Sequence, residues 1–167
     1  MKIKLYRRLI ICLSYILFIT GTAASQSATK PDQAELLKQF KGTWTCEIGK
    51  DTIAQWDMIP WGTGFEAKLK YVYKGKIIKE GKGLYGYDSA LDKIVEAGIT
   101  KGMDIGVYVM WFITDRKWIL IPYNDLKNPE KATFKMEGEF RSSDKLIEIN
   151  YTNDKPVKTK SWTASKQ

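Results

Sequence analysis

FEAKLKYVY, residues 65–73, alternates apolar side chains with mostly charged ones. Phe65 and Tyr71 fall on one face of this segment, whereas Glu66 and Lys68 fall on the other. A period of two residues places successive side chains on opposite faces of a β-strand. The segment is therefore predicted to be a strand with one buried face and one face in water.

Similar runs fill the chain on both sides of this segment, and turn residues separate them about every ten positions. The other expected strands are WTCEI (44–48), TIAQWDMI (52–59), IIKEGKGLYGYD (77–88), KIVEAGIT (93–100), GVYVMWFIT (106–114), KWILIPY (117–123), ATFKMEGEF (132–140), KLIEINYT (145–152) and VKTKSWTA (157–164). No long crossover interrupts the series, so consecutive strands are expected to pair as hairpins. We predict an all-β fold, an antiparallel up-and-down barrel of about 8–10 strands with one short N-terminal helix.

The expected helix is PDQAELLKQFKG, residues 31–42. Pro31 suits a first helical turn, Leu37 and Phe40 contribute to a narrow apolar face, and Gly42 suits the end of a helix. A helix of this length is expected to plug one mouth of the barrel.

The first residues have the pattern of a secretory signal peptide. Basic residues come first, an apolar run covers residues 9–19, and small residues follow at 20–25. The run is shorter than the roughly 20 residues that a transmembrane helix needs. The expected organisation is a signal peptide at 1–25, a flexible leader at 26–31 and a barrel domain at 32–167. The mature protein is expected to be secreted or periplasmic, with no transmembrane domain after cleavage.

The charge and the cysteines exclude some functions. The predicted signal carries four basic and no acidic residues, so the net charge falls from +8 to +4 on cleavage. The remaining positive charge is mostly lysine that alternates with apolar residues, which is typical of wet strand faces and not of nucleic-acid binding. Cys12 leaves with the signal, so Cys46 has no partner for a disulfide.

Two short motifs resemble those of the lipocalin and fatty-acid-binding-protein superfamily, the calycins. A short helix is followed by Gly-x-Trp, here Gly42 and Trp44, at the start of the first strand. A central Tyr-Gly-Tyr-Asp, residues 85–88, is similar to that of exported bacterial lipocalin-like proteins of unknown function. The resemblance implies that Trp44 packs at the closed end of the barrel, beneath a late basic residue, Arg141 or Lys160.

The chain also departs from these relatives. The last strand, VKTKSWT at residues 157–163, lacks the Arg-x-Tyr pair with which fatty-acid binders hold a carboxylate. The chain has no histidine, so the axial ligand of haem-binding relatives is missing. We expect no cofactor.

The absence of histidine also excludes Ser-His and Cys-His nucleophiles and histidine-based zinc sites. GKGLYG, residues 81–86, fits Gly-x-Gly-x-x-Gly but precedes no helix, so its glycines are expected to bend a strand or form a bulge. Glu80, Glu96 and Glu148 lie within strands and either face inward, as acids with a raised pKa, or point to solvent beside lysines; we expect the second. No catalytic residue and no metal ligand are assigned.

Large side chains on the expected inner faces are the candidate ligand-binding residues. They are Trp56, Met58, Phe65, Tyr71, Tyr85, Trp111, Trp118 and Phe134. They either fill the barrel completely or line a pocket for a small hydrophobic or aromatic molecule. A non-covalent binding protein is the leading expectation. The alternatives are a filled-barrel interaction module and an isomerase or cyclase that acts on an apolar substrate.

The segment at residues 106–113 is apolar on both faces. Val107, Val109 and Trp111 are expected to face inward, and Tyr108 and Met110 outward. An apolar outer face is expected to be covered by the helix or by a second subunit, which makes a homodimer a further expectation.

Overall fold

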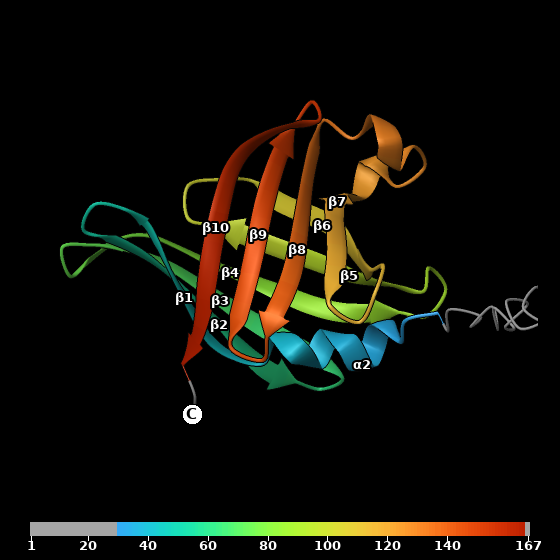
Figure 1. The fold of residues 1–167 in the computed structure, drawn as a ribbon, viewed down its shortest axis with the longest axis horizontal. Helices are drawn as coiled ribbons and strands as arrows, with labels where there is room; N and C mark the ends of the chain where they lie inside the picture. Colours follow the sequence, from blue (N-terminus) through green and yellow to red (C-terminus); the bar gives the residue numbers. More distant parts are fainter. Residues whose placement is uncertain (1–29, 166–167) are drawn as a thin grey trace, which may run out of the picture. The chain divides into compact units, whose positions relative to one another are not determined.

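The structure is a computed structural model that describes residues 30–165. The predicted signal peptide, and all but the end of the predicted leader, lie outside the described residues. The predicted fold class is confirmed, because ten antiparallel strands close into a barrel (Figure 1).

The elements follow one another in a simple order. A short helix, α2 (Gln33–Leu37), continues as a 3₁₀ turn, η1 (Lys38–Phe40). The strands are β1 (Gly42–Gly49), β2 (Thr52–Trp61), β3 (Gly64–Tyr73), β4 (Lys76–Asp88), β5 (Lys93–Thr100), β6 (Ile105–Phe112), β7 (Lys117–Pro122), β8 (Phe134–Ser142), β9 (Lys145–Thr152) and β10 (Lys155–Ser165). Two further 3₁₀ turns, η2 (Tyr123–Asp125) and η3 (Pro129–Lys131), lie between β7 and β8.

Each strand pairs with its neighbour in sequence, and β1 closes the barrel against β10. Thr43, Trp44 and Thr45 pair with Ser165, Ala164 and Thr163. The sheet therefore has no free edge, as expected for an up-and-down barrel.

Tight turns make these hairpins possible. Lys74 and Gly75 join β3 to β4, and Asn153 and Asp154 join β9 to β10. All four residues have positive φ, between 47° and 78°. Two consecutive residues with positive φ match the right-handed twist of paired strands, and Asn, Asp and Gly adopt this conformation most readily.

The helix lies across one end of the barrel, at the bottom of the view of Figure 1, and contacts β5 and β6. Asp32 caps it by accepting a hydrogen bond from the backbone N–H of Glu35. Gln33 is 4% exposed and binds β6 with both ends of its amide. Its Nε2 donates to the Phe112 carbonyl at 3.1 Å, and its Oε1 accepts from the Phe112 N–H at 2.7 Å. These bonds attach the helix to the barrel.

An aromatic core fills the closed end. Trp44 is fully buried beside the junction of β1 and β10, and its Nε1 donates to the Phe40 carbonyl at 2.8 Å. The Phe140 ring packs edge-on against Trp44 at 5.8 Å. Arg141 does not take the place suggested for it, because its side chain is 60% exposed and forms an ion pair with Glu139 at 3.0 Å. Since side chains alternate along β8, the inward residue is Phe140 and Arg141 faces solvent.

The outer face of β6 is partly covered within the chain. Val109 pairs with Val95 and Ile121, and both Val109 and Ile121 are fully buried. The 3₁₀ turn η2, between β7 and β8, contacts β6. A homodimer through this strand stays a prediction.

Within residues 30–165, no helix is long and apolar enough to cross a membrane.

Candidate functional site: a cavity inside the barrel

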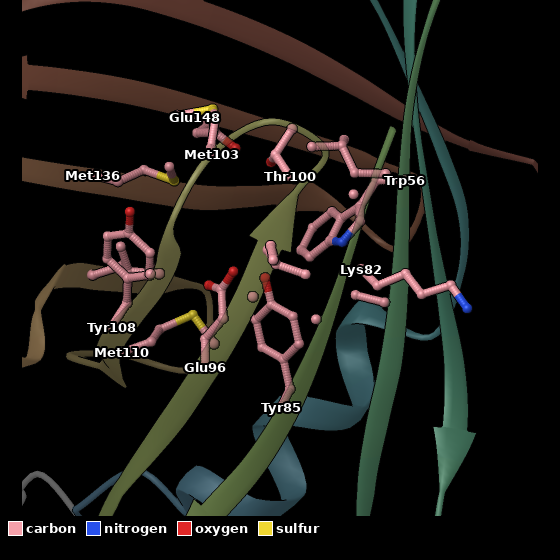
Figure 2. Close-up of a pocket in the computed structure, with 18 of the residues that line it drawn as sticks. Trp56, Lys82, Tyr85, Glu96, Thr100, Met103, Tyr108, Met110, Met136 and Glu148 are labelled. Atoms are coloured by element: carbon pink, nitrogen blue, oxygen red, sulfur yellow. The ribbon is translucent and has the colours of Figure 1, made fainter. Parts of the chain in front are cut away.

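The barrel is hollow above its aromatic core. A cavity of about 520 Å³ extends from Phe40 to the β5–β6 turn, where Met103 and Ile105 are 58% and 69% exposed. Figure 2 shows side chains from several strands facing this space. A cavity of this size suits a small organic molecule.

Glycines keep one wall of the cavity open. Gly83, Gly98 and Gly106 lie side by side on β4, β5 and β6, and all three line the cavity. A Cβ at Gly106 would lie 2.6 Å from the Tyr108 ring, so this glycine provides space for that ring. Three glycines in one row remove the side chains that would fill the barrel at this level.

GKGLYG therefore contributes space and not a bulge. Residues 81–88 of β4 pair with β5 without any register shift, so the bulge is not found, and the alternative of a bend stays a prediction. Gly81, Gly83 and Tyr85 all line the cavity because alternate residues of a strand share a face.

The floor of the cavity comes from the N-terminal segment. Phe40 is 1% exposed, and its ring lies 5.5 Å from Trp56 and 5.7 Å from Trp118. The helix and its 3₁₀ turn thus bring a plug to this end of the barrel, as the apolar face of residues 31–42 suggests.

Five of the eight candidate residues line the cavity. They are Trp56, Tyr71, Tyr85, Trp118 and Phe134. Met58 and Phe65 also belong to the core, at 2% and 5% exposure, but they do not line the cavity.

Trp111 is placed on the wrong face by the sequence pattern. The inward residues of β6 are Tyr108, Met110 and Phe112, which belong to the core or pack against it. The Trp111 ring instead lies 4.3 Å from the ammonium group of Lys93, a cation–π contact. Because β6 is apolar on both faces, alternation predicts a strand there without showing which face is inside.

Glu96 faces the cavity, contrary to the expectation that it points to solvent. Its carboxyl lies next to the hydroxyl end of Tyr85 (Figure 2). Burial raises the pKa of Glu96 to about 7, the nearby Glu148 adds to this, and a hydrogen bond with Tyr85 opposes it. Burial and the neighbouring Glu96 raise the pKa of Tyr85 well above its usual value. Glu96 is only half-buried by surface area because part of its surface lines the open cavity.

Glu148 also lies inside the barrel, at 5% exposure. It accepts a hydrogen bond from the Lys160 ammonium group, and the two side chains form an ion pair. The Lys160 side chain is 13% exposed, and the Glu148 side chain is 6% exposed. The indole Nε1 of Trp162 donates to the other carboxylate oxygen at 3.2 Å. These partners compensate the buried charge of Glu148. Glu80, the third carboxylate considered, does point outward and pairs with Lys101 at 3.8 Å.

The sequence contained signals for some of these residues. Glu96 lies two positions from Ile94 and from Gly98, so these three residues share one face of β5. Lys160 and Glu148 pair in register across β10 and β9, which only the completed sheet makes visible.

The arrangement limits the chemistry of the site. Within residues 30–165, no group of three or more Cys, Asp or Glu side chains could hold a metal ion. Cys46 is 3% exposed, and burial raises the pKa of its thiol, which disfavours the reactive thiolate. The polar groups of the cavity can bind or exchange protons, whereas its aromatic walls can hold an apolar body.

No protein-family model matches the chain, and no curated protein matches its sequence.

Proposed function

We propose that the protein is an exported, lipocalin-like barrel that binds a small hydrophobic or aromatic molecule non-covalently. The observation that carries this proposal is the cavity of about 520 Å³ lined by Trp56, Tyr85, Trp118 and Phe134. Aromatic side chains provide a large contact area and lose little conformational entropy on binding.

A hollow barrel favours binding over a filled interaction module. Closely packed interiors leave few voids larger than a water molecule, and unfilled space in a core is unfavourable. A bound apolar molecule would recover the contacts that the row of glycines removes.

Export rests on the sequence of residues 1–25, and the calycin resemblance on Gly42, Trp44 and residues 85–88. The secreted or periplasmic location is part of the proposal. Fractionation of the native host tests it directly, and protein retained in the cytoplasm with residues 1–25 intact would contradict export.

Native mass spectrometry of protein purified from its own host tests the binding function. We expect a mass excess that organic extraction removes, together with a tryptophan emission that changes when lipophilic molecules are added, because Trp56, Trp118 and Trp162 line the cavity. The proposal would be contradicted if repeated preparations carried no bound molecule and if a panel of lipophilic molecules left the tryptophan emission unchanged.

The second candidate is an isomerase or cyclase, and one observation favours it. The Glu96 carboxyl lies in a cavity with aromatic walls, and burial raises its pKa to about 7, a suitable value for a general acid or base. If a molecule extracted from the host changes its structure on incubation with the protein, but not with the Glu96→Gln variant, the enzymatic function is supported. An unchanged molecule supports simple binding.

A further inference from the structure

The charged groups of the cavity are not balanced. Glu96, Glu148 and Lys160 lie within the barrel, and Lys82 and Asp104 line the cavity as exposed residues. When Glu96 is ionised, these side chains sum to one negative charge, although the whole chain carries a net charge of +8.

The two inner carboxyls differ in their partners. Glu148 is compensated by Lys160 and by the Trp162 indole. Among residues 30–165, Glu96 has no basic partner, and Tyr85 is its hydrogen-bonding neighbour. Ionised Glu96 is therefore the group in the cavity that lacks a counter-charge.

The space beside Glu96 is open. A Cβ placed on Gly98 would lie 3.7 Å from Oε1 of Glu96, so the glycine leaves room next to this oxygen. Four aromatic residues line the same cavity: the Trp56 and Tyr85 rings are 5.9 Å apart, and the Tyr108 and Phe134 rings are 6.2 Å apart. The faces of such rings attract cations.

We propose that the ligand is a lipophilic amine, whose ammonium group binds the Glu96 carboxylate beside Tyr85 while its apolar body lies among the aromatic walls. This inference rests on the proposed binding function and specifies its ligand class. The ammonium group supplies the counter-charge that Glu96 lacks, and the charge-assisted hydrogen bond is of the strong kind.

Other ligand classes fit less well. A fatty acid would place a third carboxylate near Glu96 and Glu148, and Lys160 is already paired with Glu148. A ketone would accept a hydrogen bond only from the protonated form of Glu96, which gives the opposite dependence on pH, and an alcohol can donate to ionised Glu96 but supplies no counter-charge.

Decylamine, decanol and decanoate, three chains of equal length, distinguish these classes. Their affinities are measured by titration calorimetry at about pH 8.5 and about pH 5.5, on either side of the Glu96 pKa of about 7. An alkylammonium group, like that of lysine with its pKa of about 10.4, stays charged throughout. The other ionisable groups that face Glu96 are Tyr85 and Tyr108 on the adjacent strands and the Glu148–Lys160 pair across the barrel.

We expect decylamine to bind at least about tenfold more tightly than decanol at the higher pH, because a charged hydrogen bond is worth more than a neutral one. The advantage should shrink at the lower pH. Glu96→Gln should remove it, whereas Glu80→Gln, a matched change on the outer face, should retain it.

The inference is overturned if decanol or decanoate binds as tightly as decylamine, or if Glu96→Gln leaves the advantage of the amine intact. An advantage of decylamine that grows at the lower pH would also overturn it, since the ammonium group would then not depend on the Glu96 carboxylate. If decylamine, decanol and decanoate all fail to bind at both pH values, the proposed binding function fails as well.

Discussion

Glu96 combines two properties that rarely occur together on one side chain. It is partly accessible from the cavity, yet its surroundings raise its pKa to about 7. An ionised carboxylate in such a place is unfavourable without a partner, so the protein holds a group that is neutral in acid and charged above neutrality. The isomerase or cyclase candidate uses this change of charge, and so does the test of the lipophilic-amine ligand.

Glu96→Gln should change how stability depends on pH. The folded pKa of about 7 lies above the ordinary 4.5, so the stability that Glu96 contributes is complete below about pH 4.5 and is lost as pH rises through 7. The loss should be up to about 3 kcal/mol in the free energy of unfolding. Glutamine stays neutral, so the free energy of unfolding of the variant, measured by urea denaturation, should not fall in this way as the pH rises.

Glu80→Gln serves as the control, because Glu80 is exposed and paired with Lys101. The difference in free energy of unfolding between the wild type and Glu96→Gln should change between about pH 4 and pH 8. A constant difference over this range would contradict the buried environment assigned to Glu96.

Lys160→Met should destabilise the barrel strongly. The substitution leaves Glu148 inside the barrel without its counter-charge, and breaking a buried ion pair costs about 3–5 kcal/mol. Lys135→Met removes the more exposed pair with Glu137 and should cost less than about 1 kcal/mol. Equal midpoints of thermal unfolding for the two variants would show that the Lys160–Glu148 pair is not buried as described.

At the scale of elements, the strands themselves could be predicted, but not all of their inner faces. Strand β3 alternates clearly, and Phe65, Leu69 and Tyr71 face inward as the pattern indicates. Strand β6 is apolar on both faces, so its pattern predicts that Trp111 faces inward, whereas Tyr108 is the residue that faces the cavity. A face is fixed by pairing with neighbouring strands, which a single strand's sequence does not contain.

The Gln33 amide contributes to the attachment of α2 to the barrel. Gln33→Leu should leave the N–H and C=O of Phe112 without partners, at a cost of about 1–3 kcal/mol. Faster hydrogen exchange in α2 and at Phe112 should accompany the loss. Gln39→Leu is the matched control, since Gln39 donates to the Asp115 carbonyl at an exposed site. The two variants should differ clearly in stability, and equal values would contradict the role of Gln33.

At the scale of the whole molecule, the free volume inside the barrel could not be predicted from the sequence. Closure of ten strands fixes the width of the barrel, and the residues that face inward decide how much of it is filled. Gly83, Gly98 and Gly106 are far apart in the sequence and become one row only through the register of β4, β5 and β6. The sequence therefore left the filled and hollow barrels open, whereas the closed fold could be predicted.

The most direct test of the hollow, ligand-binding barrel is a titration of an apolar fluorescent probe into three proteins: wild type, Gly83→Val and Gly86→Val. Gly83 lines the cavity and has ordinary contacts around a Cβ, at 3.4 Å or more; Gly86 is on the same strand but does not line the cavity, and a Cβ there meets nothing within 4 Å. We predict that Gly83→Val weakens binding at least about tenfold because valine occupies the cavity, while Gly86→Val binds like wild type. Equal affinities for all three folded proteins, or no binding by any of them, would contradict the account.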